Sequence, residues 1–233
     1  MLPTPLQNRT SFKSREYRKL VKYVLKEFTE PIAYLIYCIA LFAVYRLRKD
    51  PSYRLLAVNY AIASLLLFAA IIQNELDIDN DWNYNVVFLF TICSYSYYYY
   101  SLSKSILKRR FIVTCCIANI LLFLYFNVIS GKFENNYNNY VYAFVFISIV
   151  IYSFLYFQDL LLNVSEESIL HKFDFWLVSA NLLYFLGAFI VILFYAYAEG
   201  SMRGIVWIIQ SLILFISALI TLNGYFVTTR NTQ

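Results

Sequence analysis

The residues of this chain that could do chemistry are polar side chains inside long apolar runs. A polar group within a bilayer is costly, so it is usually kept where it binds a ligand, relays a proton or pairs with another group. Asp159 is the acid that falls well inside such a run, next to Gln158. It could pair with Lys104 or Lys108 in a charge-dependent contact or switch. The simpler alternative is an interfacial acid that reaches lipid headgroups or a neighbouring base.

Five amide side chains also lie within apolar runs. Each could hydrogen-bond between two helices, a contact that contributes on the order of 1 kcal/mol and is commonly structural. Alternatively, three or more of them could converge on a polar pocket, and the sequence alone leaves both interpretations open. The amides are Asn59, Asn119, Asn181, Gln210 and Asn223.

Tyrosine occupies every position from Tyr95 to Tyr100 except Ser96. This residue is favoured where a membrane meets water, because its ring is apolar and its hydroxyl can stay hydrated. The whole chain has 23 Tyr and 21 Phe, so the run predicts an interfacial belt and general packing. An aromatic-lined cavity for an apolar ligand, a lipid or a quinone is the alternative.

The chain lacks the groupings of several kinds of catalytic or metal site. It has a single His, His171, in a polar segment, and its four Cys fall inside apolar runs, so we expect no zinc or haem site. Ser101 and Lys104 match S-x-x-K without the partner motifs that this chemistry needs. We therefore expect no catalytic residues, no metal and no cofactor. The cysteines are Cys38, Cys93, Cys115 and Cys116.

The elements that must carry these residues are long helices. Of 233 residues, 61% are hydrophobic and 14% are charged, and the net charge is +5, which excludes a soluble globular, a disordered or a fibrous chain. A span needs about 20 apolar residues, and a bilayer excludes unpaired backbone. We expect an all-α bundle of seven transmembrane helices, at about 31–45, 53–73, 85–106, 111–129, 140–162, 175–198 and 205–227.

The segments outside the spans are short. Residues 1–30 are basic, and the apolar positions from Ser11 to Phe28 are spaced as in an amphipathic helix lying on a membrane surface. A solvated leader is the alternative for this segment. The seven-helix domain then covers 31–228, and residues 229–233 form a short C-terminal tail.

The two ends of the spans differ in charge. The segment 74–84 has acids and no base, and Lys and Arg concentrate in short cytoplasmic loops. We therefore expect a cytoplasmic basic rim that meets anionic lipids or an acidic partner, with the N-terminus outside the bacterial inner membrane. The basic segment 1–30 opposes this orientation, and six spans with 31–45 re-entrant is the alternative. The rim consists of Arg46, Arg48, Lys49, Arg54, Lys104, Lys108, Arg109 and Arg110.

One stretch of the chain carries the pattern Tyr156-Phe157, Leu160-Leu161, Phe175-Trp176, Leu183-Tyr184-Phe185 and Gly187. In this pattern the chain resembles the uncharacterised small seven-span, Phe- and Tyr-rich membrane proteins of Bacteroidota. The resemblance covers roughly residues 31–228. Family members are often encoded near sensor kinases, so the resemblance implies a role associated with signalling, and it brings no catalytic residues. The chain differs in its long basic N-terminal segment and in having Asp174 where a Pro often precedes a Phe-Trp pair.

Two residues of that stretch also have an interpretation from physical chemistry. Gly187 would let a neighbouring backbone approach the sixth span closely, since it has no side chain. Trp176 would anchor the same span at the cytoplasmic interface, where an indole is favourable. Plain helix packing is the alternative for both.

Together these observations favour an integral inner-membrane protein that is not an enzyme, a sensory or scaffold subunit acting through a membrane partner such as a signalling kinase. A small transporter or channel-like module is the alternative, as is a membrane enzyme acting on a lipid. Transport predicts a cavity with converging polar groups, and an enzyme predicts an acid or nucleophile inside it. The lipid bilayer is the expected surrounding, nucleic acid is not an expected partner, and the oligomeric state stays open.

Overall fold

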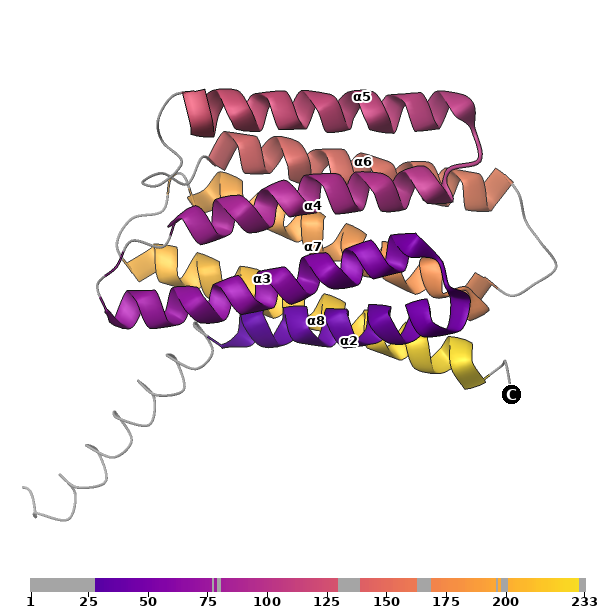
Figure 1. Ribbon diagram of the computed structural model, residues 1–233, viewed down its shortest axis with the longest axis horizontal. Helices are drawn as coiled ribbons and strands as arrows, with labels where there is room; N and C mark the ends of the chain where they lie inside the picture. The colour runs from indigo at the N-terminus through magenta and orange to yellow at the C-terminus, as the bar shows by residue number, and fades with distance from the viewer. Residues whose placement is uncertain are drawn as a thin grey trace, which may run out of the picture.

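The structure, a computed structural model, describes residues 28–76, 78, 81–129, 139–162, 169–195, 197 and 201–230. Within these residues it is helical and contains no strand, which confirms the all-α class (Figure 1). A π-helical turn, η1 (Leu124–Ile129), continues α5, and a short 3-10 turn, η2 (Ile169–His171), precedes α7. The long helices are α2 (Thr29–Arg48), α3 (Pro51–Glu75), α4 (Asp81–Leu102), α5 (Ile106–Phe123), α6 (Asn139–Leu162), α7 (Phe173–Tyr195) and α8 (Ser201–Arg230).

Six of these described helices are long and apolar enough to cross a membrane. They are α2, α3, α5 with most of η1, α6, α7 and α8. The expected third span, α4, is a helix of 22 residues, about 33 Å long at 1.5 Å per residue, but it is not among the six. Its polar tyrosines and asparagines lower its hydropathy, so apolar composition supports six spans and not the seven expected.

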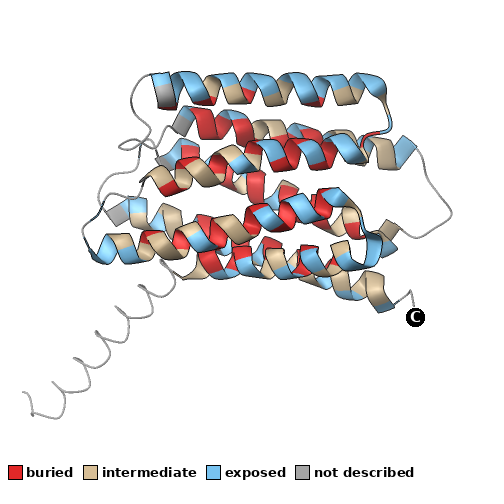
Figure 2. Cartoon of the chain, in the orientation of Figure 1, coloured by how far each residue is buried: buried red, intermediate tan, exposed pale blue. Residues whose placement is uncertain are grey.

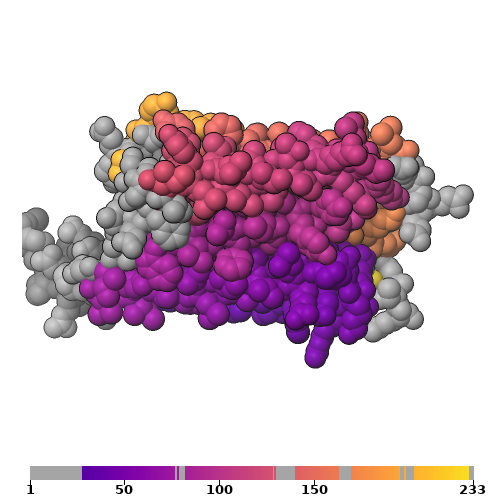
Figure 3. All heavy atoms as spheres, turned by 45° about the horizontal axis from the view of Figure 1, so that its top comes forward, coloured from indigo at the N-terminus to yellow at the C-terminus, as the bar shows by residue number. Residues whose placement is uncertain are grey.

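The helices lie side by side as an up-and-down bundle (Figure 1). Each packs against its neighbours in chain order, and α2 packs against α8, which closes the ring. The least buried of the six spans is α5, whose residues are mostly exposed in Figure 2. In the space-filling view α5 lies beside α4 on the surface (Figure 3). The core is therefore formed mainly by the other six helices.

The first helical hairpin has the tightest turn of the bundle's described connections. Lys49 ends α2 in the left-handed region, with φ 59°, and its N–H donates to Tyr45 O at 2.8 Å. Asp50 then caps α3, accepting from the backbone N–H of Ser52 at 2.8 Å and from its hydroxyl at 2.7 Å. Pro51 occupies the first turn of α3, where no N–H is needed. Local chemistry thus fixes two helices antiparallel with only Lys49 and Asp50 between them.

Charge separates the two ends of the bundle, as the sequence predicts. We call the end with the α2–α3 and α4–α5 turns the basic end, because the described Lys and Arg residues lie there, Arg203 excepted. The opposite end carries the first turns of α2, α4, α6 and α8 and the last turn of α3, with Glu30, Glu75 and Asp81. The basic end is on the right in Figure 1.

The first span begins earlier than the sequence predicts. The first span starts at Thr29, not at 31, so Glu30 lies in its first turn. α2 is a continuous helix of 20 residues, which does not favour a re-entrant segment at 31–45. The amphipathic helix expected between Ser11 and Phe28 lies outside the described residues, apart from Phe28 itself.

Close packing of α7 on α8 uses two glycines, one of them foreseen. A Cβ added at Gly187 would lie 2.9 Å from Ile213 Cδ1, the end of a flexible side chain. A Cβ at Gly224 would overlap Cβ and the ring of Trp176. Trp176 also donates from Nε1 to Leu170 O at 2.8 Å. Trp176 is therefore a packing residue held against Gly224, besides its place near the basic end.

Candidate functional site

A cavity of about 50 Å³ lies in the half of the bundle away from the basic end. Because roughly 10–15 Å³ is enough to hold one water, the cavity can take water or a small ligand. Six helices contribute to its wall, which combines aromatic rings with a carboxyl, two amides and the hydroxyls of Thr91 and several tyrosines. Its lining includes Glu30, Tyr34, Asn59, Tyr60, Thr91, Tyr95, Tyr184, Trp207 and Gln210.

Glu30 is the acid of this cavity, and the sequence interpretation missed it. Its residue is 7% exposed, and the Tyr34 hydroxyl donates to its Oε1 at 3.4 Å. Counting residues 1–30 as a leader placed Glu30 outside the membrane. The signal that could have found it is its position directly before Pro31, because Pro and acids both favour the first turn of a helix.

Two of the predicted amides, Asn59 and Gln210, line the same cavity and are 3% and 5% exposed. Asn59 donates from Nδ2 to Thr91 Oγ1 at 3.5 Å, while the Thr91 hydroxyl donates to Val87 O at 3.0 Å. Thr91 thereby fixes which way the Asn59 amide faces. The Asn59 Oδ1 atom has no hydrogen-bond partner among the described residues. An acceptor is thus left over in the cavity that Glu30 also lines.

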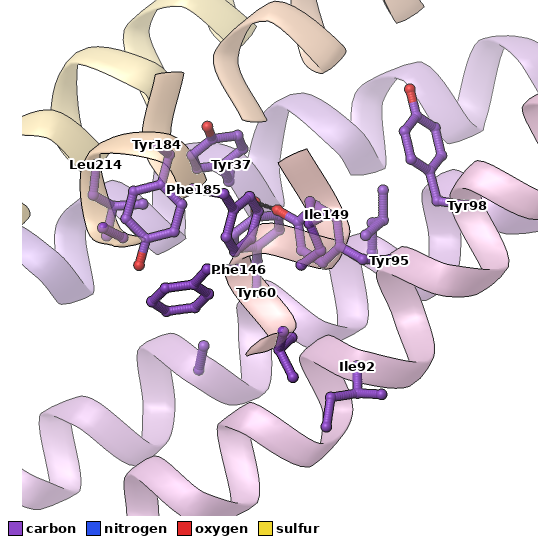
Figure 4. Close-up of a cluster of buried hydrophobic side chains, with 14 of the residues drawn as sticks. Tyr37, Tyr60, Ile92, Tyr95, Tyr98, Phe146, Ile149, Tyr184, Phe185 and Leu214 are labelled. Atoms are coloured by element: carbon purple, nitrogen blue, oxygen red, sulfur yellow. Dashed lines mark hydrogen bonds between the residues drawn. The ribbon is translucent and has the colours of Figure 1, made fainter. Parts of the chain in front are cut away.

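Tyrosines extend from the cavity into the core. The hydroxyls of Tyr34 and Tyr184 lie 3.3 Å apart, and those of Tyr60 and Tyr95 form a hydrogen bond, drawn as the dashed line in Figure 4. Tyr95 also donates to Asn181 Oδ1 at 3.3 Å. These bonds join α2 to α7, α3 to α4 and α4 to α7.

A second cluster of polar side chains lies at the basic end. Asp174, in the first turn of α7, accepts at Oδ1 from Tyr53 at 2.6 Å and from Tyr98 at 3.0 Å. Its Oδ2 accepts from Arg48 at 3.4 Å, and Arg48 also donates to the Tyr53 hydroxyl at 3.2 Å. Tyr98 lies one helical turn from Tyr95 on α4. Asp174 thus joins α2, α3, α4 and α7, although the sequence interpretation left it in a loop.

The Tyr95–Tyr100 run is divided between the core, as its expected packing role requires, and the outer surface of α4. Tyr95, Tyr98 and Tyr99 are 1%, 0% and 2% exposed, whereas Tyr97 and Tyr100 are 43% and 38% exposed. Positions separated by three or four residues share one face of a helix, so this run places three hydroxyls inside. Tyr99 bonds Ser153 on α6 at 2.6 Å.

The other predicted polar residues do not join the cavity. Asn119 donates to Ser148 at 3.1 Å, between α5 and α6, as expected for a structural contact. Gln158 and Asn223 are exposed. Asp159 does pair with one of its two predicted partners: Lys108 Nζ lies 2.7 Å from Asp159 Oδ1.

The basic rim is divided between internal contacts and exposed charge. Arg48 and Lys108 are held by Asp174 and Asp159. Arg46 lies over the ring of Phe42, with Cζ 5.7 Å from the centroid. The exposed members are Arg46, Arg48, Lys49, Arg54, Lys104 and Arg110.

Within the described residues no group of three or more His, Cys, Asp or Glu is placed to hold a metal ion. Comparison with family models, curated proteins and solved structures gave no match. The features that bear on function are the cavity and the hydrogen-bonded side chains of the core.

Proposed function

We propose that the chain is a sensory or scaffold subunit of the bacterial cytoplasmic membrane, with seven spans, that binds a small ligand and acts through a protein partner. The observation that carries the proposal is a series of three hydrogen-bonded groups of polar side chains in one bundle. The first contains Glu30 in the cavity, the second joins Tyr60, Tyr95 and Asn181, and the third surrounds Asp174 and Arg48 at the basic end.

Counting α4 as a span rests on how its hydroxyls are used. A tyrosine lowers apolar character only while its hydroxyl needs water, and those of Tyr95, Tyr98 and Tyr99 are bonded to other helices. α4 is also about as long as a hydrocarbon core is thick, about 30 Å. With α4 included, the chain crosses the membrane seven times between Thr29 and Arg230.

The orientation follows from the positive-inside tendency. The basic end belongs in the cytoplasm, because short loops rich in Lys and Arg stay there. The cavity then lies in the outer half of the membrane, and the start of α2 faces outward. A ligand would therefore arrive from outside the cell, and the response would appear inside it.

The cavity wall limits the ligand's chemistry. The Glu30 carboxyl and Asn59 Oδ1 are acceptors, and aromatic rings such as Tyr60 and Trp207 surround them. A small molecule with hydrogen-bond donors fits such a wall, and a protonated amine also gains from the negative faces of the rings.

The ligand half of the proposal is tested with a matched pair of probes. Ethylammonium and ethanol have the same number of heavy atoms and differ in charge. The unfolding temperature of the purified protein should rise with ethylammonium and should not rise with ethanol. Glu30→Gln should abolish the rise, whereas Glu75→Gln, an exposed acid at the same end, should retain it. An equal effect of both probes would argue against a cation site.

The partner half is tested by affinity capture from native membranes followed by mass spectrometry. We expect a membrane kinase or a similar signalling protein with the wild type. Recovery should fall at least several-fold with Arg54→Gln, on the exposed α2–α3 turn, and with Asp174→Asn, which breaks the link to Arg48. Lys104→Gln, on the other turn of the rim, is the control. The scaffold role is contradicted if no protein is captured. It is also contradicted if the captured protein is recovered equally well with the two variants.

A small transporter is the second candidate, because a carboxyl and amides converge in one cavity. The packed tyrosines between that cavity and the basic end favour a sensor instead. Uptake of labelled ethylammonium into proteoliposomes that depends on Glu30 would reverse this preference.

A further inference from the structure

A groove of about 320 Å³ runs along the outside of the bundle between α4 and α5. On α4 it is lined by Cys93, Tyr97 and Tyr100, which share one helical face, and on α5 by Val113 and Ile117. From Cys93 to Tyr100 it extends roughly 10 Å along the helix axis, at 1.5 Å per residue. Its wall is almost wholly apolar, so in a membrane a hydrocarbon chain is its natural occupant.

An arginine is fixed where this groove meets the basic end. Arg109 Nε donates to Ser103 O at 2.8 Å, and its Cζ lies 5.2 Å from the centroid of Tyr100, a groove residue. Among the described residues this carbonyl is the one acceptor of the Arg109 guanidinium. The remaining N–H groups of its planar fork match two oxygens of a phosphate.

The surrounding turn is positively charged and exposed. Lys108 is paired with Asp159, which leaves the charges of Lys104, Arg109 and Arg110 without an acidic neighbour among the described residues. Lys104 and Arg110 are exposed beside Arg109. Basic pockets between spans on the cytoplasmic side are typical sites for anionic headgroups.

We propose that the groove and this turn form a binding site for an anionic phospholipid. One acyl chain lies between α4 and α5, and the headgroup phosphate pairs with Arg109, with Lys104 and Arg110 beside it. The site is separate from the cavity and from the α2–α3 half of the rim. A protein partner with an acidic surface would use the same charges but would not need the groove.

The test uses the full chain in nanodiscs of phosphatidylcholine with a minority of phosphatidylglycerol. Native mass spectrometry then counts the lipids that stay bound. Arg109→Gln removes the fork, and Val113→Trp fills the groove while leaving the charge. The matched controls are Arg54→Gln, an exposed base of the other turn, and Leu219→Trp, an exposed apolar residue of α8.

We expect retained phosphatidylglycerol to fall about tenfold with Arg109→Gln, since hydrogen bonds to charged groups have that magnitude. Val113→Trp should have a similar effect, and both controls should bind as the wild type does. The proposal is overturned if the wild type retains phosphatidylcholine as well as it retains phosphatidylglycerol. It is also overturned if Arg109→Gln weakens lipid binding while Val113→Trp does not, because that pattern describes surface charge without a groove.

Discussion

Asp174 is the residue on which most of the basic end depends. It lies in a stretch that reads from sequence as a polar loop, yet it accepts hydrogen bonds from three other helices. Because both tyrosines use Oδ1 and Arg48 uses Oδ2, the two kinds of contact can be separated by a single substitution.

Asp174→Asn should keep an acceptor for Tyr53 and Tyr98 but should place an NH₂ donor against Arg48. We expect a loss of about 1–2 kcal/mol of stability, the magnitude of a hydrogen bond to a charged group in a partly exposed pair. Thermal unfolding in detergent measures it, with Arg54→Gln as the control expected within about 0.5 kcal/mol of wild type. An unchanged transition for Asp174→Asn would mean that the pair is dispensable.

Gly224 should be less tolerant of substitution than Gly187. Gly224→Ala forces a methyl group into Trp176, whose ring and Cβ have little freedom to move, and overpacking of this kind costs about 1–3 kcal/mol. Gly187→Ala meets only the tip of Ile213 and should cost under about 1 kcal/mol. Unfolding of the two variants, measured in parallel, would contradict this packing account if the order were reversed.

Some side-chain contacts were predictable from the sequence, and the others depend on how the helices pack. The Lys108–Asp159 pair was foreseen because an acid inside an apolar run needs a nearby base. Glu30 was missed because a span was assumed to begin at Pro31. No sequence pattern could show that Asn59 and Gln210 share a cavity wall while Asn119 does not, since that depends on how the helices rotate.

Among the elements, the α2–α3 turn has the clearest local strain. Lys49 adopts a left-handed conformation that costs a residue with a side chain roughly 1–2 kcal/mol, whereas glycine adopts it freely. The turn nevertheless places Lys49 and its neighbours on the exposed rim proposed to contact a partner.

Lys49→Gly should raise the stability of the chain by about 0.5–1 kcal/mol, after the added flexibility of the unfolded state is subtracted. Lys49→Ala removes the same charge and keeps the strain, so it should give no gain. Equal unfolding temperatures for the two variants would show that the charge, and not the backbone, sets the effect.

At the scale of the whole molecule, the helical bundle and the charge difference between its ends were predictable, because composition and spacing decide both. The status of α4 was harder, since an apolar count rates a tyrosine the same whether its hydroxyl is bonded or not. The hydroxyls of Tyr98 and Tyr99 lie about one helical turn from that of Tyr95, and the three have partners on α3, α6 and α7. Those partners come from remote parts of the chain, beyond the reach of any local pattern.

Cysteine accessibility in the full-length protein tests the seven-span count. In a variant with the four native cysteines changed to Ser, Ile78→Cys should react with an impermeant maleimide applied outside the cell. Lys104→Cys should react only after the membrane is permeabilised. Labelling of both from the same side would mean that α4 does not cross.

The tyrosines of α4 also set an order of events during synthesis. Tyr98 and Tyr95 bond to Asp174 and Asn181, which leave the ribosome some 80 residues later. Until α7 is made, the Tyr98 hydroxyl lacks its carboxylate partner and Tyr95 has only Tyr60, and hydrocarbon is a poor place for incompletely bonded polar groups. α4 would therefore wait beside the insertion machinery or at the membrane surface, and enter fully only when α7 arrives. A chain that stops at residue 162 should leave position 104 exposed on the wrong side or spread between both, whereas one that reaches residue 195 should not.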